Sequence, residues 1–384
     1  MESTATIEEG RDTSARTAEL VDLISELGPD VPEISRRLGQ FKESVRYRYK
    51  EKVLGKGFSI HVLPNHEKLG LQRVVMLAEF APVYKTYAHS ILTAMNELCY
   101  VVSFERRMFR GDFLVEASVP AEFTDAFVGL IYKLKAKGLF TSVEVVPFEW
   151  FRTIPMRTEY YDFDTGRWDF DWSNLQKQSD DAGYRPSGRA KFDKQDLLIL
   201  KELQIDATRS FIEISGRLKE NYKKLAWHYK THVVGRGLIN RYYLRWMGTS
   251  YSTVLERALH RKHRYQQLAI LATGLTELER MNLMARSHMV PFIWNEMVGK
   301  TAYCANFFFP TEYITEAYQF LTETIADTKD KTSVLALDQT EALSFTISHQ
   351  LYDEKKREWT FDEPKLLEGF DDLIAKIMEI GGAV

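Results

Sequence analysis

The sequence predicts an α+β protein in which two three-helix units, each followed by a strand, alternate with two βαββαβ units. Three observations predict this fold class. One segment of the first half recurs in the second half, its apolar residues repeat at helical spacing, and the same order of strands and helices follows both copies. A chain of 384 residues is also too long for one ordinary core, so we expect several domains.

The recurring segment covers residues 32–58 and 212–238. The two stretches align without a gap at a constant offset of 180, and ten of the 27 positions are identical. The identities include Glu33/Glu213, Ile34/Ile214, Ser35/Ser215, Leu38/Leu218, Tyr49/Tyr229, Val53/Val233, Gly55/Gly235 and Gly57/Gly237. Two unrelated amphipathic helices would not share so many positions in register, which indicates an internal duplication.

Each copy predicts three short helices and a strand. The predicted helices are, in chain order, about 20–27, 31–38 and 41–53 in the first copy and 199–203, 211–218 and 221–233 in the second. In the third helix of the first copy, Val45, Tyr49 and Val53 fall at i, i+4 and i+8 and therefore share one face. A Gly-x-Gly sequence ends this helix in both copies, and an alternating strand, the wing, follows it.

The other face of each third helix carries cations and aromatic rings. Although the net charge of the chain is −3, Val31–Gly57 contains eight Lys/Arg against three Glu, and Phe211–Gly237 six against two. A basic helix followed by a wing fits a major groove while its cations contact phosphates. One such face alone is usually only solvated, but its recurrence favours DNA binding. The candidate DNA-binding residues are Lys42, Ser44, Arg46, Tyr47, Arg48, Lys50, Lys56, Tyr222, Lys223, Lys224, Trp227, His228, Lys230 and Arg236.

The segment after each wing has the order strand, helix, strand, strand, helix, strand, which is the ferredoxin-like order. The first copy predicts strands at 73–80, 100–109, 112–119 and 141–148, with helices at 84–98 and 121–137. The second copy predicts strands at 267–273, 292–298, 303–309 and 342–348, with helices at 277–288 and 311–327. A hairpin is appended to both copies, at 161–171 and 352–362.

These elements predict the domain organisation. The expected parts are a disordered N-terminus (1–15), a winged helix-turn-helix (16–66), a ferredoxin-like domain with its hairpin (67–172), a linker (173–190), a second winged helix-turn-helix (191–250), and a second ferredoxin-like domain with a hairpin and a C-terminal helix (251–384).

Several motifs resemble the Lrp/AsnC family of bacterial and archaeal transcription regulators. The run from Phe192 to Ser215 looks like the helix-turn-helix opening of that family. Ser44–Arg48 resembles its recognition helix, and Leu63–Gly70 resembles its link from the wing to the effector domain. Arg110–Leu114 resembles the Gly-Asp turn of its ferredoxin-like domain.

The resemblance covers most of residues 17–150 and 192–350, and it implies a sequence-specific regulator that is not an enzyme. It implies double-stranded DNA as a partner, a homodimer through ferredoxin-like domains that pair sheet against sheet, and a small-molecule effector between them. Family members usually carry one unit per chain, so the tandem copy implies such a pair within one chain. Thr301-Ala302 replaces the Gly-Asp turn in the second copy, which argues against a family-type effector site there.

Two alternatives remain open at the level of sequence. Siroheme decarboxylases resemble this architecture and carry His and Arg residues for the porphyrin carboxylates; here Arg106, Arg107 and His288 are the candidates. A protein-binding transcription cofactor would use Tyr222 and Trp227 at an interface. The basic cluster at 260–264 suits phosphate contacts or a solvated link equally well.

Composition bounds the remaining possibilities. A hydrophobic content of 45% and a charged content of 27% are typical of a globular protein. No stretch approaches the run of about eighteen or more apolar residues of a membrane helix, and the N-terminus is polar, so we expect a cytoplasmic protein without a membrane partner. Cys99 and Cys304 are far apart and predict buried free thiols. Neither a cofactor nor a metal site is indicated.

Overall fold

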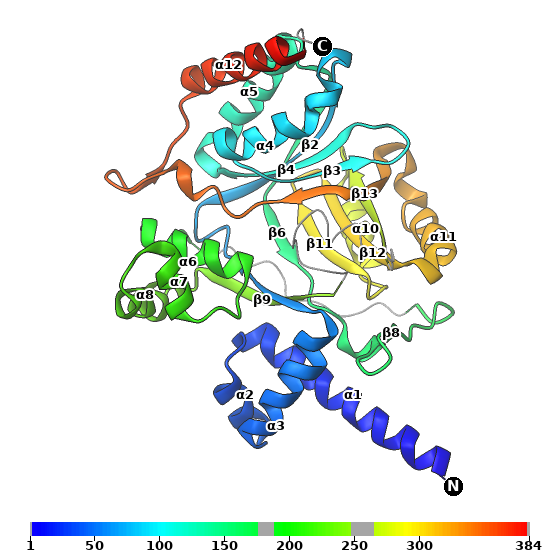
Figure 1. Cartoon of the computed structure of the whole chain (residues 1–384). Helices are drawn as coiled ribbons and strands as arrows, with labels where there is room; N and C mark the ends of the chain where they lie inside the picture. The colour runs from blue at the N-terminus through cyan, green and yellow to red at the C-terminus, as the bar shows by residue number, and fades with distance from the viewer. Residues whose placement is uncertain (1, 176–187, 247–264, 382–384) are drawn as a thin grey trace.

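The computed structural model describes residues 2–175, 188–246 and 265–381 of the chain (Figure 1). It is an α+β structure with one large antiparallel sheet, a smaller two-stranded ribbon, and helices on the outside, which confirms the predicted fold class. The basic cluster predicted at 260–264 lies outside the described residues.

Both copies fold as three helices, as predicted. The first unit contains α1 (Glu2–Leu27), α2 (Val31–Leu38) and α3 (Lys42–Arg48), and the second contains α6 (Lys194–Ile205), α7 (Phe211–Leu218) and α8 (Tyr222–His228). The third helix continues in each copy as a π-helical turn, Tyr49–Val53 or Tyr229–Val234. Side-chain caps start the second helices, because the Asp30 and Ser210 oxygens accept backbone N–H bonds from Glu33 and Glu213.

Helix α1 is longer than the sequence predicts. We expected the first fifteen residues to be disordered, but the helix begins at Glu2. Leu20, Val21 and Ile24 are buried in the core of the first unit, and the same helix continues from them toward the N-terminus. Packing of one end nucleates the helix, and adding further turns then costs little.

The two wings pair with each other. Strand β1 (Ser59–Pro64) and strand β9 (Ile239–Arg245) form an antiparallel two-stranded ribbon in which Val62 lies opposite Tyr242. A single exposed strand would leave its backbone N–H and C=O groups unpaired, and the second copy supplies the missing partner. The ribbon therefore joins the two helical units (Figure 1).

The two βαββαβ units share one nine-stranded sheet. Its strands are, in spatial order, β5 (Phe140–Phe148), β2 (Leu71–Phe80), β4 (Phe113–Pro120), β3 (Val101–Arg107), β13 (Thr332–Ser344), β10 (Tyr265–Ala272), β12 (Tyr303–Pro310), β11 (Ile293–Val298) and β6 (Trp150–Thr153). The halves join where Leu337 of β13 pairs with Arg107 of β3. Because β6 directly follows β5 yet pairs with β11 at the other end, the sheet closes on itself.

The closed sheet packs its two halves against each other. Its interior contains a cluster of buried residues from both copies, including Val75, Leu114, Ala269, Met297 and Cys304. The expected pairing of the two units sheet against sheet thus occurs within one chain. Both cysteines are free and buried, as predicted.

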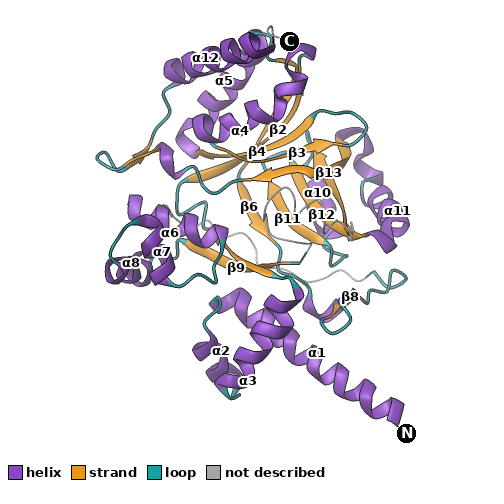
Figure 2. Cartoon of the chain, in the orientation of Figure 1, coloured by secondary structure: helices purple, strands orange, loops and turns teal. Residues whose placement is uncertain are grey.

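Helices cover the outer faces of the sheet (Figure 2). They are α4 (Ala88–Cys99), α5 (Thr124–Ala136), α10 (Glu277–Ser287), α11 (Ile314–Thr324) and α12 (Glu363–Gly381). Helix α12 follows the second copy but packs on α4 and α5 of the first, where Lys137 pairs with Asp371 at 2.6 Å. Among the described residues, no helix combines the length and the apolar character needed to cross a membrane.

Both appended hairpins form, and each docks on the other copy. Trp168 of β7–β8 (Tyr161–Asp162 and Arg167–Trp168) donates its indole N–H to Tyr265 Oη at 3.1 Å. Trp359 of β14–β15 (Tyr352–Asp353 and Glu358–Trp359) donates to the carbonyl of Leu69 at 2.9 Å. This reciprocal exchange ties the two halves together.

One predicted strand was misplaced. We expected the last strand of the second unit at 342–348, whereas β13 runs from Thr332 to Ser344. Helix α11 ends at Thr324, earlier than the predicted 327, and a 3-10 turn at Ala326–Lys331 leads directly into the strand. The long strand forms because it has a neighbour on each side, β10 and β3, and the second of these belongs to the other copy.

Candidate active site

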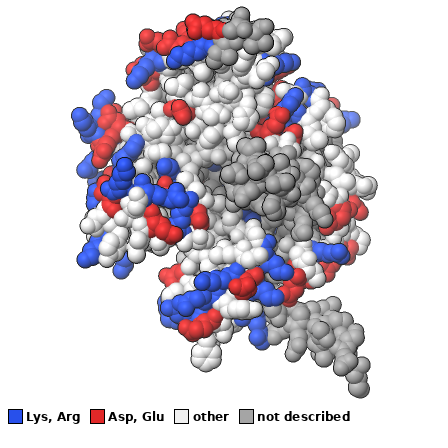
Figure 3. Space-filling view, viewed as in Figure 1, with Lys and Arg blue, Asp and Glu red and all other residues white. Residues whose placement is uncertain are grey.

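Most of the predicted DNA-binding residues lie exposed on the third helices. The exposed ones are Lys42, Ser44, Arg46, Tyr47, Lys50 and Lys56 in the first copy and Tyr222, Lys223, Lys224, Trp227 and Lys230 in the second. Lys and Arg side chains gather over both helical units in Figure 3.

Three of the predicted residues turn toward the protein instead. His228 is buried and its Nδ1 lies 3.0 Å from Asp196 Oδ1. Arg236 donates to the backbone carbonyl of Lys191 at 2.6 Å, and Arg48 donates to Gln40 Oε1 at 3.1 Å. Arg48 and His228 lie on the side of the third helix that faces its own unit, and Arg236 lies in the turn after the helix. The helical spacing of the core residues alone did not reveal these contacts.

A cavity of about 650 Å³ lies between the β1–β9 ribbon and the nine-stranded sheet. This volume falls within the range of about 300–1,000 Å³ that is usual for small-molecule and cofactor sites. Both copies contribute to it. The polar and charged lining residues include Ser59, His61, His66, Arg73, Ser103, Glu105, Glu116, Arg209, Tyr243, Arg245, Gln267, Asn295 and Asn306.

The polar lining continues the apolar rows of the sheet interior. Side chains two residues apart share a face of a strand, so Arg73 lies in line with Val75 and Glu116 with Leu114. In the second copy, Gln267, Asn295 and Asn306 extend the rows of Ala269, Met297 and Cys304 in the same way. The interior is therefore apolar at one end and becomes a charged cavity at the end covered by the ribbon.

Arg73 is a buried cation without a full set of partners. Its Nη1 lies 3.7 Å from Glu116 Oε2, and the guanidinium carbon lies 4.3 Å from the centre of the Phe151 ring. Both Nε and Nη1 are buried and make no hydrogen bond. Burial lowers the pKa of Arg73, although Glu116 opposes the shift. Buried guanidinium N–H groups are costly unless satisfied, so they fit an anionic ligand in the cavity.

Two buried histidines line the cavity beside Arg73. His61 Nδ1 donates to the carbonyl of Gln204 at 2.9 Å, so its Nε2 accepts from Ser59 Oγ at 2.7 Å. Burial lowers the pKa of His61 to about 4. Burial, together with the Arg73 charge, lowers the pKa of His66 well below its usual value. Both rings are therefore neutral at pH 7 and can accept or donate hydrogen bonds.

Two carboxyl groups complete the charged part of the cavity. Burial, reinforced by the neighbouring Glu116, raises the pKa of Glu105 to about 7. Burial also raises the pKa of Glu116, against the opposing effect of Arg73, and Asn306 Nδ2 donates to Glu116 at 3.4 Å. A carboxyl group with a pKa near 7 suits general acid–base chemistry, because both protonation states are populated at neutral pH.

Aromatic rings form part of the cavity wall. Tyr243 stacks on His61 with ring centres 5.4 Å apart, and it meets Trp294 edge-on at 5.1 Å. Trp294 in turn contacts Phe308. Flat apolar surfaces of this kind suit a planar conjugated ligand.

The decarboxylase-type candidates from the sequence lie elsewhere. Arg106 pairs with Glu341, Arg107 forms an ion pair with Asp112, and His288 Nε2 lies 3.0 Å from Glu296 Oε2. None of the three lines the cavity. The aspartate of the predicted Gly-Asp turn, Asp112, therefore has a structural role, because it pairs with Arg107 of β3.

Sequence reasoning missed the residues that do line the cavity. His61 lies in the predicted wing, His66 in the link after it, and Arg73 at the start of an otherwise apolar strand. One signal could have revealed Arg73. This residue lies two residues before Val75 on the same face of a strand, and a charged residue on a buried face is costly unless it has a partner. Arg209 and Arg245 come from the second copy, and only the tertiary structure brings them to the same cavity.

We predict that Glu105→Gln stabilises the fold at high pH. The folded-state pKa of about 7 lies above the ordinary 4.5, so between these pH values the unfolded chain releases a proton that the folded chain keeps, and the wild type loses stability as the pH rises. The free energy of unfolding should therefore exceed the wild-type value by about 2–3 kcal/mol at pH 8, with the difference vanishing by pH 4. Urea unfolding at both pH values measures this.

An exposed acid provides the control for this measurement. Glu354→Gln, in the C-terminal hairpin, should follow the wild-type pH dependence. A pH-independent difference for Glu105→Gln would contradict the proposed burial of its charge.

Comparison with protein-family models and with curated protein sequences gives no match. Among solved structures, the siroheme decarboxylase NirDL is similar over 92% of this chain and 99% of its own, with 12% identity and a TM-score of 0.54. NirDL in complex with an iron-uroporphyrin III analogue is similar over 94% and 98%, with 11% identity and a TM-score of 0.52. At this identity the similarity shows a shared fold.

A regulator of the AsnC family from Pyrococcus furiosus is similar only to part of the chain. The match covers 34% of this chain and 86% of that protein, with 16% identity and a TM-score of 0.27. We expected the chain not to be an enzyme. That expectation is contradicted, because the similar structures that extend over nearly the whole chain are those of an enzyme.

Proposed function

We propose that the chain is an enzyme that binds a polycarboxylated, planar tetrapyrrole of the siroheme type in the cavity and decarboxylates it. The observation that carries this proposal is Arg73, whose buried Nε and Nη1 atoms make no hydrogen bond at a cavity of about 650 Å³. A carboxylate is the natural counterion for that group. The tetrapyrrole is the substrate, and its class is suggested by the structures that share the fold over the whole chain.

The other cavity residues support the same ligand. Tyr243, Trp294 and Phe308 offer apolar surface to a macrocycle, and Arg245 adds positive charge to the cavity wall. Arg209 also lines the cavity but is paired with Glu202 at 2.6 Å. The neutral histidines need not lose a proton to contact the substrate. For His61, a ligand would have to replace Ser59 as the partner of Nε2. Residues of both copies line this cavity, so the tandem chain supplies the whole site.

The proposed reaction needs two groups from the protein. Loss of CO2 breaks a carbon–carbon bond and leaves the electron pair on the side-chain carbon, conjugated with the macrocycle, and a proton then replaces the carboxyl group. Arg73 would orient a substrate carboxylate. Glu105 can supply the proton, because its pKa of about 7 keeps a substantial protonated fraction at neutral pH.

Incubation with siroheme tests the proposal. We expect one equivalent per chain to bind, with a shift in the visible absorbance of the macrocycle, and carboxyl groups to be lost as measured by mass spectrometry of the extracted pigment. Absence of binding at micromolar pigment would refute the ligand class. Binding without carboxyl loss would refute the enzymatic part.

DNA binding is a second candidate function. The specific observation in its favour is the exposed row formed by Lys42, Arg46, Tyr47 and Lys50 on the third helix of the first unit. This row lies outside the cavity, so a DNA-binding role is compatible with a tetrapyrrole site. In that case the cavity ligand would act as the effector of a regulator.

Charge reversal tests this second role. The triple variant Lys42→Glu, Arg46→Glu and Lys50→Glu should weaken binding to genomic DNA fragments by at least about 100-fold. The slope of the logarithm of affinity against the logarithm of salt concentration should become shallower by about the contribution of three phosphate contacts. A gel-shift titration at several salt concentrations measures both effects. The matched control reverses three exposed cations away from the helix, Arg110, Lys135 and Lys300. Equal DNA affinity for the two triple variants would exclude this helix as the contact surface.

A further inference from the structure

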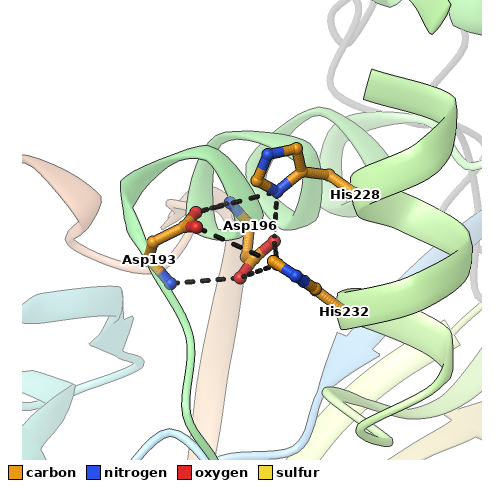
Figure 4. A group of neighbouring side chains, drawn as sticks. All are labelled: Asp193, Asp196, His228 and His232. Carbon is orange, nitrogen blue, oxygen red and sulfur yellow. Dashed lines mark hydrogen bonds and ion pairs between the residues drawn. The ribbon is translucent and has the colours of Figure 1, made fainter. Parts of the chain in front are cut away.

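Two aspartates and two histidines form a compact cluster in the second helical unit (Figure 4). Asp193 and Asp196 lie at the start of α6, and His228 and His232 lie one turn apart on the third helix and its π-helical continuation. One potential ligand atom from each residue lies within 4.8 Å of all the others. The cluster is separate from the cavity, since none of the four residues lines it.

The spacing of the ligand atoms fits a single ion. His228 Nδ1 and His232 Nδ1 lie 3.0 and 3.2 Å from Asp196 Oδ1, and both lie 3.9 Å from an Asp193 oxygen. Four ligands at about 2.0–2.2 Å from a tetrahedral zinc ion are separated from one another by about 3.3–3.6 Å. The observed separations bracket that value, so an ion requires only small shifts of the side chains.

The chemistry of the cluster also fits a divalent cation. Asp196 is fully buried, and both imidazoles present the same nitrogen, Nδ1, to its carboxylate. Two carboxylates would balance the charge of one divalent ion. Imidazole and carboxylate together suit borderline ions such as Zn²⁺. The ring of Trp227 meets His228 and His232 edge-on at 5.2 and 4.9 Å and covers them with apolar surface.

The first copy provides an internal comparison. At the offset of 180, His228 and His232 correspond to Arg48 and Lys52. Arg48 donates to Gln40, and Lys52 pairs with Asp164 at 2.8 Å, so the same two positions there are cations that cannot bind a metal. The histidines are thus a feature of the second copy and not a requirement of the helical fold.

We propose that Asp193, Asp196, His228 and His232 bind one divalent transition-metal ion of the zinc type. The ion would connect the start of α6 to the third helix of the second unit. Because the ligands come from two helices, metal binding stabilises their packing and fixes the orientation of the helix that carries Tyr222 and Trp227.

Zinc titration of the chelator-treated full chain tests the site. We expect one Zn²⁺ per chain by calorimetry, and Co²⁺ should give the visible absorbance of a tetrahedral site. His232→Gln should weaken Zn²⁺ binding by at least about 100-fold, since loss of an outer-shell partner alone costs about 10–100-fold. Asp193→Asn should also weaken it, and this variant keeps the helix cap because asparagine is a good N-cap residue.

An exposed histidine outside the cluster serves as the control. His89→Gln should bind Zn²⁺ like the wild type. The proposal is overturned if the wild type binds no Zn²⁺ at micromolar concentration, or if Asp193→Asn and His89→Gln bind it equally well. Circular dichroism shows whether each variant is folded. If His232→Gln does not fold, the Zn²⁺ affinity of Asp193→Asn tests the proposal.

Discussion

Replacing Arg73 by methionine is expected to weaken tetrapyrrole binding at least about 30-fold. Arg73 is the buried cation of the cavity whose Nε and Nη1 have no hydrogen-bond partner in the described structure. Truncating one partner of a buried charge pair costs about 2–5 kcal/mol, so the dissociation constant should rise at least about 30-fold. An absorbance titration with siroheme measures this change.

The variant should remain folded. Methionine fills similar space, and Glu116 can become protonated once its cation is removed, because burial already raises its pKa. Arg106→Met is the matched control, because Arg106 is an exposed cation of β3 that pairs with Glu341, and this variant should bind siroheme like the wild type. Normal affinity of Arg73→Met would show that the substrate carboxylates are held elsewhere.

Glu296→Ala is expected to have the largest effect on stability. Glu296 is fully buried, accepts a hydrogen bond from Tyr303 Oη at 2.9 Å, and pairs with His288 and with Arg152. Arg152 lies directly opposite it on β6, so the ion pair joins the two strands that close the sheet. Removing one partner of a buried pair costs about 3–5 kcal/mol, because the other charge loses its counterion.

Urea unfolding measures the loss, with Glu358→Ala as the control. Glu358 is an exposed acid of the C-terminal hairpin whose pair with Lys356 is long, at 3.9 Å, so its removal should change stability by less than about 0.5 kcal/mol. A similar small effect for Glu296→Ala would mean that the closure at β6 does not depend on this ion pair.

Local patterns in the sequence were sufficient for the elements of the fold. The apolar periodicity of the third helices, the Gly-x-Gly ends and the repeated order of strands and helices depend on residues close together in the chain. The predicted hairpins at 161–171 and 352–362 formed for the same reason. The helix that reaches Glu2 and the early start of β13 were missed. The first extends from the packed part of α1 by helix propagation, and the second depends on pairing with β3 of the other copy.

Only one of the three candidate sites could be predicted from the sequence. A basic helix face is visible in the sequence, and its residues are exposed except Arg48, His228 and Arg236. The cavity was invisible, because its histidines and Arg73 are scattered over a wing, a link and a strand that look like ordinary structural segments. The Asp/His cluster was overlooked as well. Its two aspartates are close together in the chain, as are its two histidines, but the aspartates and the histidines are separated by at least 32 residues.

The sequence by itself determined the duplication, the type and order of the elements, and the difference between the two copies at each aligned position. Only the tertiary structure decided that the wings pair with each other, that the sheet closes through β6, and that charges from both copies face one cavity. The physical reason is that strand pairing and burial depend on contacts between residues far apart in the chain, which no local periodicity specifies.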